Sequence, residues 1–401
     1  MAIQILSNLN YPIGNIINQE LLNANSAKMA VAFLKYSGVK VIDRLRYGIY
    51  FSKNPQAFFM VIPMKIQCTV KDVLRKIRPP LAKWFKKKSF FKQFIAQKNM
   101  PLPEWIQLEP TPRCNLHCGT CTRETMAPER LNKDLSLDEF KKIVSQFPTL
   151  KEIKFQGMGE PLLCRSLKSM LEYGTSIGIR FTMISNGTIL TDENIELVLK
   201  YISHFTISVD AGSKQTFEKV RAGANYERVM ENISKLIKQK TELKSKTLIA
   251  MSFVVTHLNY HEIPTFIELC EKVGADEFGL VEVENWLMPT QEEYESSKEF
   301  IRLAREVNAQ KYITNYKGKM KPNYLSSLKR KATCPWSFNW CYITAGGFVT
   351  PCCIRTNPDA FNFGNIFETP LKDIWNGKKI KKFRRANRTD SPNPICDFCP
   401  D

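Results

Sequence analysis

The sequence predicts an α/β fold built on a parallel sheet, followed by a small cysteine-rich domain. From about residue 105 onward, short apolar runs alternate with segments of helical periodicity, which is the pattern of β-α units around a parallel sheet. The cysteines are unevenly spread, because six of the 12 follow residue 330. A length of 401 residues favours two or three domains over one.

Six of the apolar runs are predicted strands, at residues 105–109, 153–156, 181–184, 205–209, 248–255 and 277–283. Helical periodicity is found between them at residues 137–147, 167–177, 192–199, 216–220 continuing into 226–239, and 263–273. Ser136 is a predicted N-cap of the first of these helices. Functional residues collect at the carboxyl ends of strands in barrels of this kind. We therefore expect the motifs that follow the strands to share one site.

Composition limits where this chain resides. A hydrophobic content of 43% is enough for packed cores, yet no apolar run approaches the roughly 18 residues of a membrane span. The first residues lack the charged and apolar regions of a signal peptide. The chain is thus predicted to be cytoplasmic, where cysteines serve as metal ligands or free thiols more often than as disulfides.

The net charge of +19 lies mainly in the first 100 residues, which hold 17 Lys or Arg against three acidic residues. Residues 75–98 contain nine basic and no acidic side chains, with five aromatic ones interleaved. Such a stretch suits an anionic membrane surface or nucleic acid, and equally a solvated helix face. A second basic run, residues 378–388, is predicted to be a solvated helix.

Cys114, Cys118 and Cys121 form a C-x3-C-x2-C motif after the first predicted strand. A 4Fe-4S cluster normally takes four cysteines, so three leave one iron free to bind a small molecule. Structural zinc sites usually combine two C-x2-C pairs or Cys with His, and His117 has no matching His-x3-5-His elsewhere. An open cluster is therefore favoured over zinc, a disulfide or inert thiols.

The second predicted strand is followed by Gly157, Met158, Gly159 and Glu160. Glycines after a strand let the backbone approach a ligand closely, and a carboxylate there accepts hydrogen bonds from an ammonium group. A simple turn is the alternative.

Polar side chains also end the next two predicted strands. Ser185 and Asn186 end the third, and Ser208 and Asp210 end the fourth. Short polar groups at adjacent strand ends suit ribose hydroxyls, although each also suits a helix cap. Arg221 lies beyond the fourth strand, where its planar fork of donors suits a carboxylate and where plain surface exposure is the alternative.

Together these motifs resemble the radical S-adenosylmethionine (radical SAM) superfamily, over about 300 residues from Leu102 onward. The resemblance implies a partial (β/α)6 TIM-like barrel. It also implies a catalytic 4Fe-4S cluster on the three loop cysteines whose open iron binds S-adenosylmethionine. The glycine-rich motif would bind the methionine amine, the residues at the third and fourth strands the ribose and methionine groups, and Arg221 the methionine carboxylate. One departure is Thr120, a position commonly aromatic in this family, which puts adenine stacking by the loop in doubt.

The C-terminal cysteines resemble the SPASM/Twitch extensions of radical SAM enzymes. Cys334, Cys352, Cys396 and Cys399 would supply four thiolates for a second 4Fe-4S cluster, and zinc would fit the same spacing. The later C-x5-C-x3-C portion of the complete SPASM pattern is missing. Cys341 and Cys353 are left over as buried or spare thiols, hydrogen-atom donors or replacement ligands.

The predicted organisation is a basic extension at residues 1–100, a radical SAM core at 101–315 and an auxiliary-cluster domain at 316–401. The predicted reaction is reductive cleavage of S-adenosylmethionine to a 5′-deoxyadenosyl radical, which removes a hydrogen from a peptide or small molecule. Oxidation, cross-linking and epimerisation all remain open as outcomes. A reductant such as flavodoxin or ferredoxin is the implied partner. The alternative is a non-catalytic iron-sulfur or zinc protein that binds nucleic acid or anionic lipid through its basic arm.

Overall fold

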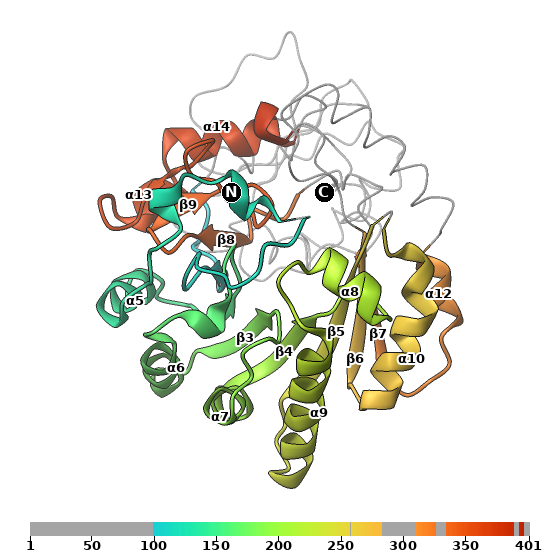
Figure 1. Ribbon diagram of the computed structural model, residues 1–401. Helices are drawn as coiled ribbons and strands as arrows, with labels where there is room; N and C mark the ends of the chain where they lie inside the picture. Colours follow the sequence, from blue (N-terminus) through green and yellow to red (C-terminus); the bar gives the residue numbers. More distant parts are fainter. Residues whose placement is uncertain are drawn as a thin grey trace, which may run out of the picture. The chain divides into compact units, whose positions relative to one another are not determined.

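The computed structural model describes residues 99–119, 121–256, 258–282, 309–325, 334–388 and 393–396. The basic segment at residues 75–98, Thr120 and Cys399 lie outside these ranges. The described residues from 105 to 325 alternate strands and helices, as predicted (Figure 1). The strands are β1 (Trp105–Leu108), β2 (Glu152–Phe155), β3 (Arg180–Ser185), β4 (Ile202–Ser208), β5 (Leu248–Val255), β6 (Glu277–Glu282) and β7 (Lys321–Leu325). The helices are α5 (Leu137–Val144), α6 (Leu167–Ser176), α7 (Asp192–Tyr201), α8 (Lys214–Val220), α9 (Tyr226–Glu242), α10 (Ile263–Val273) and α12 (Gln310–Asn315).

The strands from β1 to β7 pair in chain order and run parallel throughout. All six predicted strands are present, and the α/β fold with a parallel sheet is confirmed. The sequence did not predict β7, because Lys-Pro-Asn-Tyr-Leu is polar and contains a proline. A lone edge strand tolerates both features.

The predicted N-cap Ser136 is present at the start of α5. The Ser136 hydroxyl accepts from the backbone N–H of Glu139, whose side chain returns the bond, so α5 starts with a capping box. The helical patterns predicted at residues 216–220 and 226–239 correspond to α8 and α9, which are separate helices because α8 ends at Val220 and α9 begins behind an Asn225 cap. Gly223, with a φ of +94°, makes the break between them.

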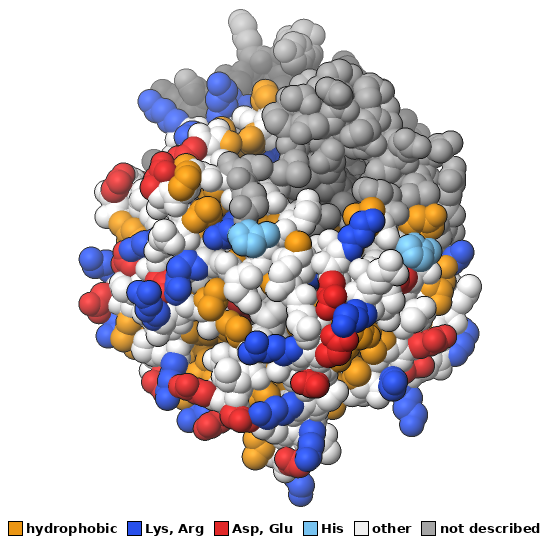
Figure 2. Space-filling model, in the orientation of Figure 1, with side chains coloured by type: hydrophobic (Ala, Val, Ile, Leu, Met, Phe, Trp, Pro, Cys, Tyr) orange, Lys and Arg blue, Asp and Glu red, His pale blue; other side chains and the backbone are white. Residues whose placement is uncertain are grey.

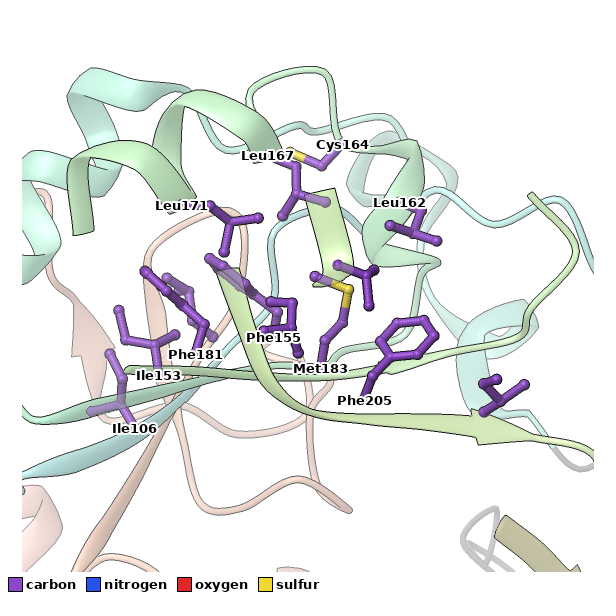
Figure 3. Close-up of a cluster of buried hydrophobic side chains, with 14 of the residues drawn as sticks. Ile106, Ile153, Phe155, Leu162, Cys164, Leu167, Leu171, Phe181, Met183 and Phe205 are labelled. Carbon is purple, nitrogen blue, oxygen red and sulfur yellow. The ribbon is translucent and has the colours of Figure 1, made fainter. Parts of the chain in front are cut away.

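The core lies between the sheet and the helices that cover its outer face. Figure 3 shows Phe155, Phe181 and Met183 on the strands facing Leu167 and Leu171 on α6. The rings of Phe155 and Phe181 stack with centroids 5.3 Å apart. Because neighbouring residues of a strand face opposite sides, the polar residues between these apolar ones face the inside of the barrel.

The C-terminal segment extends the same sheet. Its strands are β8 (Trp340–Ile343), β9 (Phe348–Thr350) and β10 (Gly364–Asn365), and its helices are α13 (Leu371–Trp375) and α14 (Lys378–Ala386). Strand β8 pairs in parallel with β1, while β9 and β10 pair antiparallel beyond it. Short 3-10 turns complete the described structure at Thr122–Thr125, Pro128–Arg130, Pro161–Leu163, Tyr260–Glu262 and Pro394–Cys396. The residues at which the domains divide stay predictions.

The surface of the described residues carries both signs of charge. Figure 2 shows Lys and Arg side chains interspersed with Asp and Glu over this face of the molecule. This mixture agrees with a net charge of only +5 on residues 101–401, which is the total of +19 less the +14 of the first 100. None of the helices in the described part of the chain combines the length and apolar content needed to cross a bilayer.

Candidate active site

The loop that carries Cys114, Cys118 and Cys121 leaves the carboxyl end of β1. Its backbone turns at Cys118, whose carbonyl accepts from the N–H of Cys121 at 3.0 Å, and the N–H of His117 donates to the carbonyl of Ala222 at 2.9 Å. All three thiols are half-buried, and each lies within electrostatic range of another. Burial is the main cause that raises the pKa of each thiol. Thiolates at this site therefore need a cation to stabilise them.

The loop does not form a site for a single ion. Among the residues that the structure describes, no three His, Cys, Asp or Glu side chains converge closely enough to hold one metal. A cubane cluster binds its cysteines through different irons, so its thiolates stand further apart than the ligands of one zinc.

Arg113 fixes the loop at its first cysteine. Its guanidinium donates from Nε to Oδ1 of Asp134 at 2.8 Å and from Nη2 to Oδ2 at 2.6 Å. The Thr111 hydroxyl donates to the same carboxylate at 2.7 Å. Burial alone would raise the pKa of Asp134, but these hydrogen bonds outweigh it and the pKa is lowered. This anchor was not predicted, although Arg113 directly precedes the first cysteine.

The glycine-rich turn after β2 packs directly against the cysteine loop. A Cβ atom on Gly159 would lie 2.2 Å from the carbonyl oxygen of Thr111 and 2.5 Å from that of Arg113, so no other residue fits. The N–H of Glu160 donates to the carbonyl of Arg113 at 2.8 Å. A Cβ atom on Gly157 would clash with the side chain of Glu109. Gly159 therefore allows two backbone segments to pack closely, and Gly157 leaves room for the Glu109 side chain.

The carboxylate of Glu160 is almost fully buried and links the glycine turn to the end of β3. It accepts from the Ser185 hydroxyl at 2.9 Å, from the Asn186 N–H at 2.7 Å and from the Leu162 N–H at 3.1 Å. Burial raises the pKa of Glu160, and these donors oppose the rise. A carboxylate has about four lone-pair positions, so three donors leave room for one more.

Asn186 connects the end of β3 to the cysteine loop. Its amide nitrogen donates to Oδ1 of Asn115 at 3.0 Å and lies 3.8 Å from Sγ of Cys114. Its amide oxygen accepts from the N–H and the hydroxyl of Thr188. The third strand thus reaches the first loop cysteine, as expected for adjacent strand ends.

Asp210 holds Arg221 beside the loop. Asp210 is buried with a φ of +61°, and its carboxylate accepts from the Val254 N–H at 2.7 Å and pairs with Nη2 of Arg221 at 2.5 Å. The Arg221 side chain also lies beside the Cys118 thiol, where its charge favours the thiolate. Among the described residues, its buried Nε has no hydrogen-bond partner. Ser208 is half-buried at the end of β4 and accepts a long bond from the Ser252 hydroxyl at 3.5 Å.

Glu109 is a buried carboxylate that was not predicted. It ends the first apolar run, accepts from the Met158 N–H at 2.9 Å and from the Ala345 N–H at 3.1 Å, and lies 3.4 Å from the Tyr342 hydroxyl. Burial is the main cause that raises its pKa. A single acidic residue at the end of a buried strand was the signal that could have identified it.

Of the four predicted auxiliary ligands, three lie in described residues. Cys352 is buried in a small cluster with Trp336 and Tyr342, against which Cys334 packs. Cys396 accepts from the amide nitrogen of Asn387 at 3.6 Å. Arg355 connects the two parts, because its N–H donates to Sγ of Cys352 at 3.4 Å and its Nε to the carbonyl of Ile395 at 2.8 Å. The grouping of all four stays a prediction.

The leftover cysteines differ in environment. Cys341 points into the hydrophobic core and is 2% exposed, and burial raises the pKa of its thiol to about 12. A thiol in this position is inert, and its burial agrees with the simplest of the predicted roles. Cys353 is half-buried beside the auxiliary cysteines.

Comparison with known proteins places these features in a family. Residues 108–270 match the radical SAM superfamily, and residues 334–400 match an iron-sulfur cluster-binding domain, SPASM. The chain is 28% identical over 323 residues to a tungsten-containing aldehyde ferredoxin oxidoreductase cofactor-modifying protein of Pyrococcus furiosus, covering 74% of this chain and 87% of that protein. It is 22% identical to a PqqA peptide cyclase of Granulibacter bethesdensis, covering 74% and 80%.

The fold has close counterparts among solved structures. SuiB of Streptococcus suis, in a crystal structure with its precursor peptide SuiA, matches with a TM-score of 0.58 at 16% identity, over 85% of this chain and 78% of that one. At this level of identity the likeness concerns the fold alone.

Proposed function

Because the chain is a radical SAM enzyme with a C-terminal SPASM domain, we propose that Cys114, Cys118 and Cys121 hold its catalytic 4Fe-4S cluster. A catalytic cluster, S-adenosylmethionine and an auxiliary cluster are the cofactors of this enzyme. Bound together at the open iron, cluster and cosubstrate supply a 5′-deoxyadenosyl radical after one-electron reduction. The residues around the loop hold and orient the cosubstrate.

One observation carries this assignment. Arg221 is charged and half-buried beside Cys118, and its buried Nε has no partner among the described residues. Leaving a buried donor unpaired costs about 1–3 kcal/mol, so this position favours a ligand with a carboxylate. The methionine carboxylate of the cosubstrate has that chemistry, and Asp210 then acts as a positioning residue for Arg221.

The remaining contacts follow from the same arrangement. Glu160 has one acceptor position left for the methionine amine, while it orients Ser185 and Asn186. The backbone of Gly157 and Gly159 lines the approach to the loop, and Ser208 suits a ribose hydroxyl. Asn186 is placed to donate toward the Cys114 sulfur.

The radical removes a hydrogen atom from the substrate, and we propose a peptide as the first class to test. The PqqA cyclase is named for a peptide, and SuiB was solved with one. Small molecules are the second class, and oxidation, cross-linking and epimerisation are the candidate outcomes. Cys334, Cys352, Cys396 and Cys399 hold the auxiliary cluster in this proposal, and a flavodoxin or ferredoxin supplies the electron. Neither the family matches nor the similar proteins support a non-catalytic role.

The test is cleavage of the cosubstrate. Reduced, anaerobically reconstituted protein should form 5′-deoxyadenosine from S-adenosylmethionine, even slowly without substrate. Cys118→Ala should abolish this product, whereas Cys270→Ala, a buried cysteine of α10 far from any motif, should retain it. Product formation by Cys118→Ala at the wild-type rate would overturn the assignment of the loop.

A further inference from the structure

Helix α14 contains a buried arginine that the sequence did not predict. The basic run of residues 378–388 was expected to be solvated, yet Arg384 is 0% exposed. Its neighbour Arg385 is exposed, as expected. One cation of the basic run therefore faces the interior of the protein.

The guanidinium of Arg384 contacts its neighbours, but two of its nitrogen atoms have no hydrogen-bond partner in the described structure. Its Nε donates to the carbonyl of Ser337, and its charge lies over the Trp375 ring at 4.5 Å from the centroid. Both Nη1 and Nη2 are buried, and neither has a hydrogen-bond partner among the described residues. Arg388, one turn on, also has an unpartnered buried Nε and lies over the Phe338 ring at 4.1 Å.

These cations lack a counter-charge in the part of the chain that the structure describes. No described Asp or Glu pairs with Arg384. Burial lowers the pKa of Arg384 to about 10, so the group is still charged at neutral pH. The nearby Cys341 thiol is neutral, because burial raises its pKa to about 12. A buried unpaired charge costs several kcal/mol, so this position favours an anion.

Residues next to the arginines contact the auxiliary cysteines. Asn387, one turn after Arg384 on the same stretch, donates to Sγ of Cys396. Ser337, which accepts from Arg384, follows Trp336, and Trp336 packs in the cluster that contains Cys352. A cluster with four thiolates is a buried anion, and reduction adds one more negative charge to it.

We propose that Arg384, assisted by Arg388, supplies positive charge and N–H donors to the auxiliary cluster and raises its reduction potential. This inference rests on the proposed function, since it assumes a cluster at the C-terminal cysteines. Positive charge and hydrogen bonds to sulfur stabilise the reduced cluster more than the oxidised one.

The experiment isolates the auxiliary cluster. In a Cys114, Cys118, Cys121→Ala background, the reconstituted protein is titrated electrochemically while its reduced-cluster EPR signal is recorded. Arg384→Gln should shift the midpoint to a more negative potential, and Arg384→Lys, which keeps the charge, should shift it less. Arg385→Gln removes the adjacent exposed charge and should leave the potential unchanged, because solvent screens it.

The outcomes separate this inference from the function it rests on. Equal potentials for the background and Arg384→Gln, with iron intact, would overturn the inference alone. Absence of iron from the background would overturn the auxiliary cluster and the inference together. Loss of iron in Arg384→Gln but not in Arg384→Lys would support a requirement for the charge. Loss in both would assign Arg384 to packing and overturn the inference.

Discussion

Glu109 and Tyr342 lie 233 residues apart in the chain and meet where β1 and β8 end, with the Tyr342 hydroxyl 3.4 Å from Oε1 of the carboxylate. Glu109 also accepts from Met158 in the glycine turn and from Ala345 beyond β8. One buried carboxylate thus connects the barrel, the turn beside the cysteine loop and the C-terminal segment. Glu109 thus brings the turn after β2 and the segment after β8 into contact.

Removing the Tyr342 hydroxyl should weaken that connection. Tyr342→Phe leaves a buried carboxylate short of one donor, and we expect a loss of about 1 kcal/mol in the free energy of unfolding. Urea unfolding of the anaerobic, reconstituted protein measures it. Tyr316→Phe is the matched control, since its hydroxyl bonds Glu271 at the exposed surface and should matter less. Equal losses in the two variants would contradict a special role for the buried pair.

Glu109 should also make stability depend on pH. Its folded-state pKa is raised above the usual 4.5, mainly by burial. The folded protein therefore keeps this proton to higher pH than the unfolded chain. The stability that this proton gives the folded state is fully present below pH 4.5. It is lost as the pH rises through the folded-state pKa of Glu109.

Glu109→Gln removes the titrating group. The free energy of unfolding of this variant should therefore fall less with rising pH than that of the wild type. Urea midpoints of wild type and variant, measured from about pH 5 to pH 8, test it. Glu104→Gln is the control, because Glu104 is exposed and pairs with Lys151 at the surface. A decline of equal slope in wild type and Glu109→Gln would assign the pH dependence to other groups.

Much of this architecture was predictable because it is local. Apolar runs such as Ile153–Gln156 in the sequence alternate with helical patterns, and each run became a strand of the parallel sheet. The pairing of β8 with β1 was not predictable, since the two segments are far apart and neither has a charge pattern that specifies the other. Long-range pairing depends on the whole packed core rather than on local sequence.

The residues of the candidate site also fall into those that could be predicted from the sequence and those that could not. Spacing indicated the cysteines, because thiolate ligation needs that residue type, whereas the glycine turn was a weak signal until the resemblance to radical SAM enzymes supported it. The role of Asp210 as the partner of Arg221 was hidden, since it depends on the break between α8 and α9 that turns Arg221 inward. Arg384 was hidden as well, because a basic run does not reveal which member faces the core.

Arg221 should be required for cosubstrate binding but not for the clusters. A charge-assisted hydrogen bond is worth about 1.5–3 kcal/mol, so Arg221→Lys should weaken S-adenosylmethionine binding by roughly tenfold to hundredfold. Equilibrium dialysis of the reconstituted protein measures the dissociation constant, and iron analysis confirms intact clusters. Arg228→Lys, on the exposed side of α9, is the control. Unchanged binding in Arg221→Lys would remove it from the cosubstrate site.

Iron content should report the two cysteine groups separately. Four irons in each cubane predict about eight per chain after reconstitution and about four in the triple Cys114, Cys118, Cys121→Ala variant. Cys270→Ala should keep about eight, because that thiol is buried in α10 and apart from both groups. Zinc in place of the second four irons would contradict the auxiliary cluster.

The basic segment before residue 99 should be separable from the clusters. The first described residues are already fixed to the C-terminal helices: the Trp375 indole donates to the carbonyl of Pro101 at 2.9 Å, and the Met100 N–H donates to Asn376 at 2.7 Å. A chain starting at Asn99 keeps these contacts and should bind about eight irons, as two cubanes require.

The same truncation removes residues 1–98, which carry all of the +14 charge of the first 100 residues. Binding to acidic vesicles or nucleic acid should therefore fall with the truncation, and that of the intact chain should fall steeply with salt. Sedimentation with vesicles and filter binding with nucleic acid, each over a salt series, measure both. Salt-independent binding would identify the segment as a solvated helix, and loss of iron on truncation would make it part of the fold.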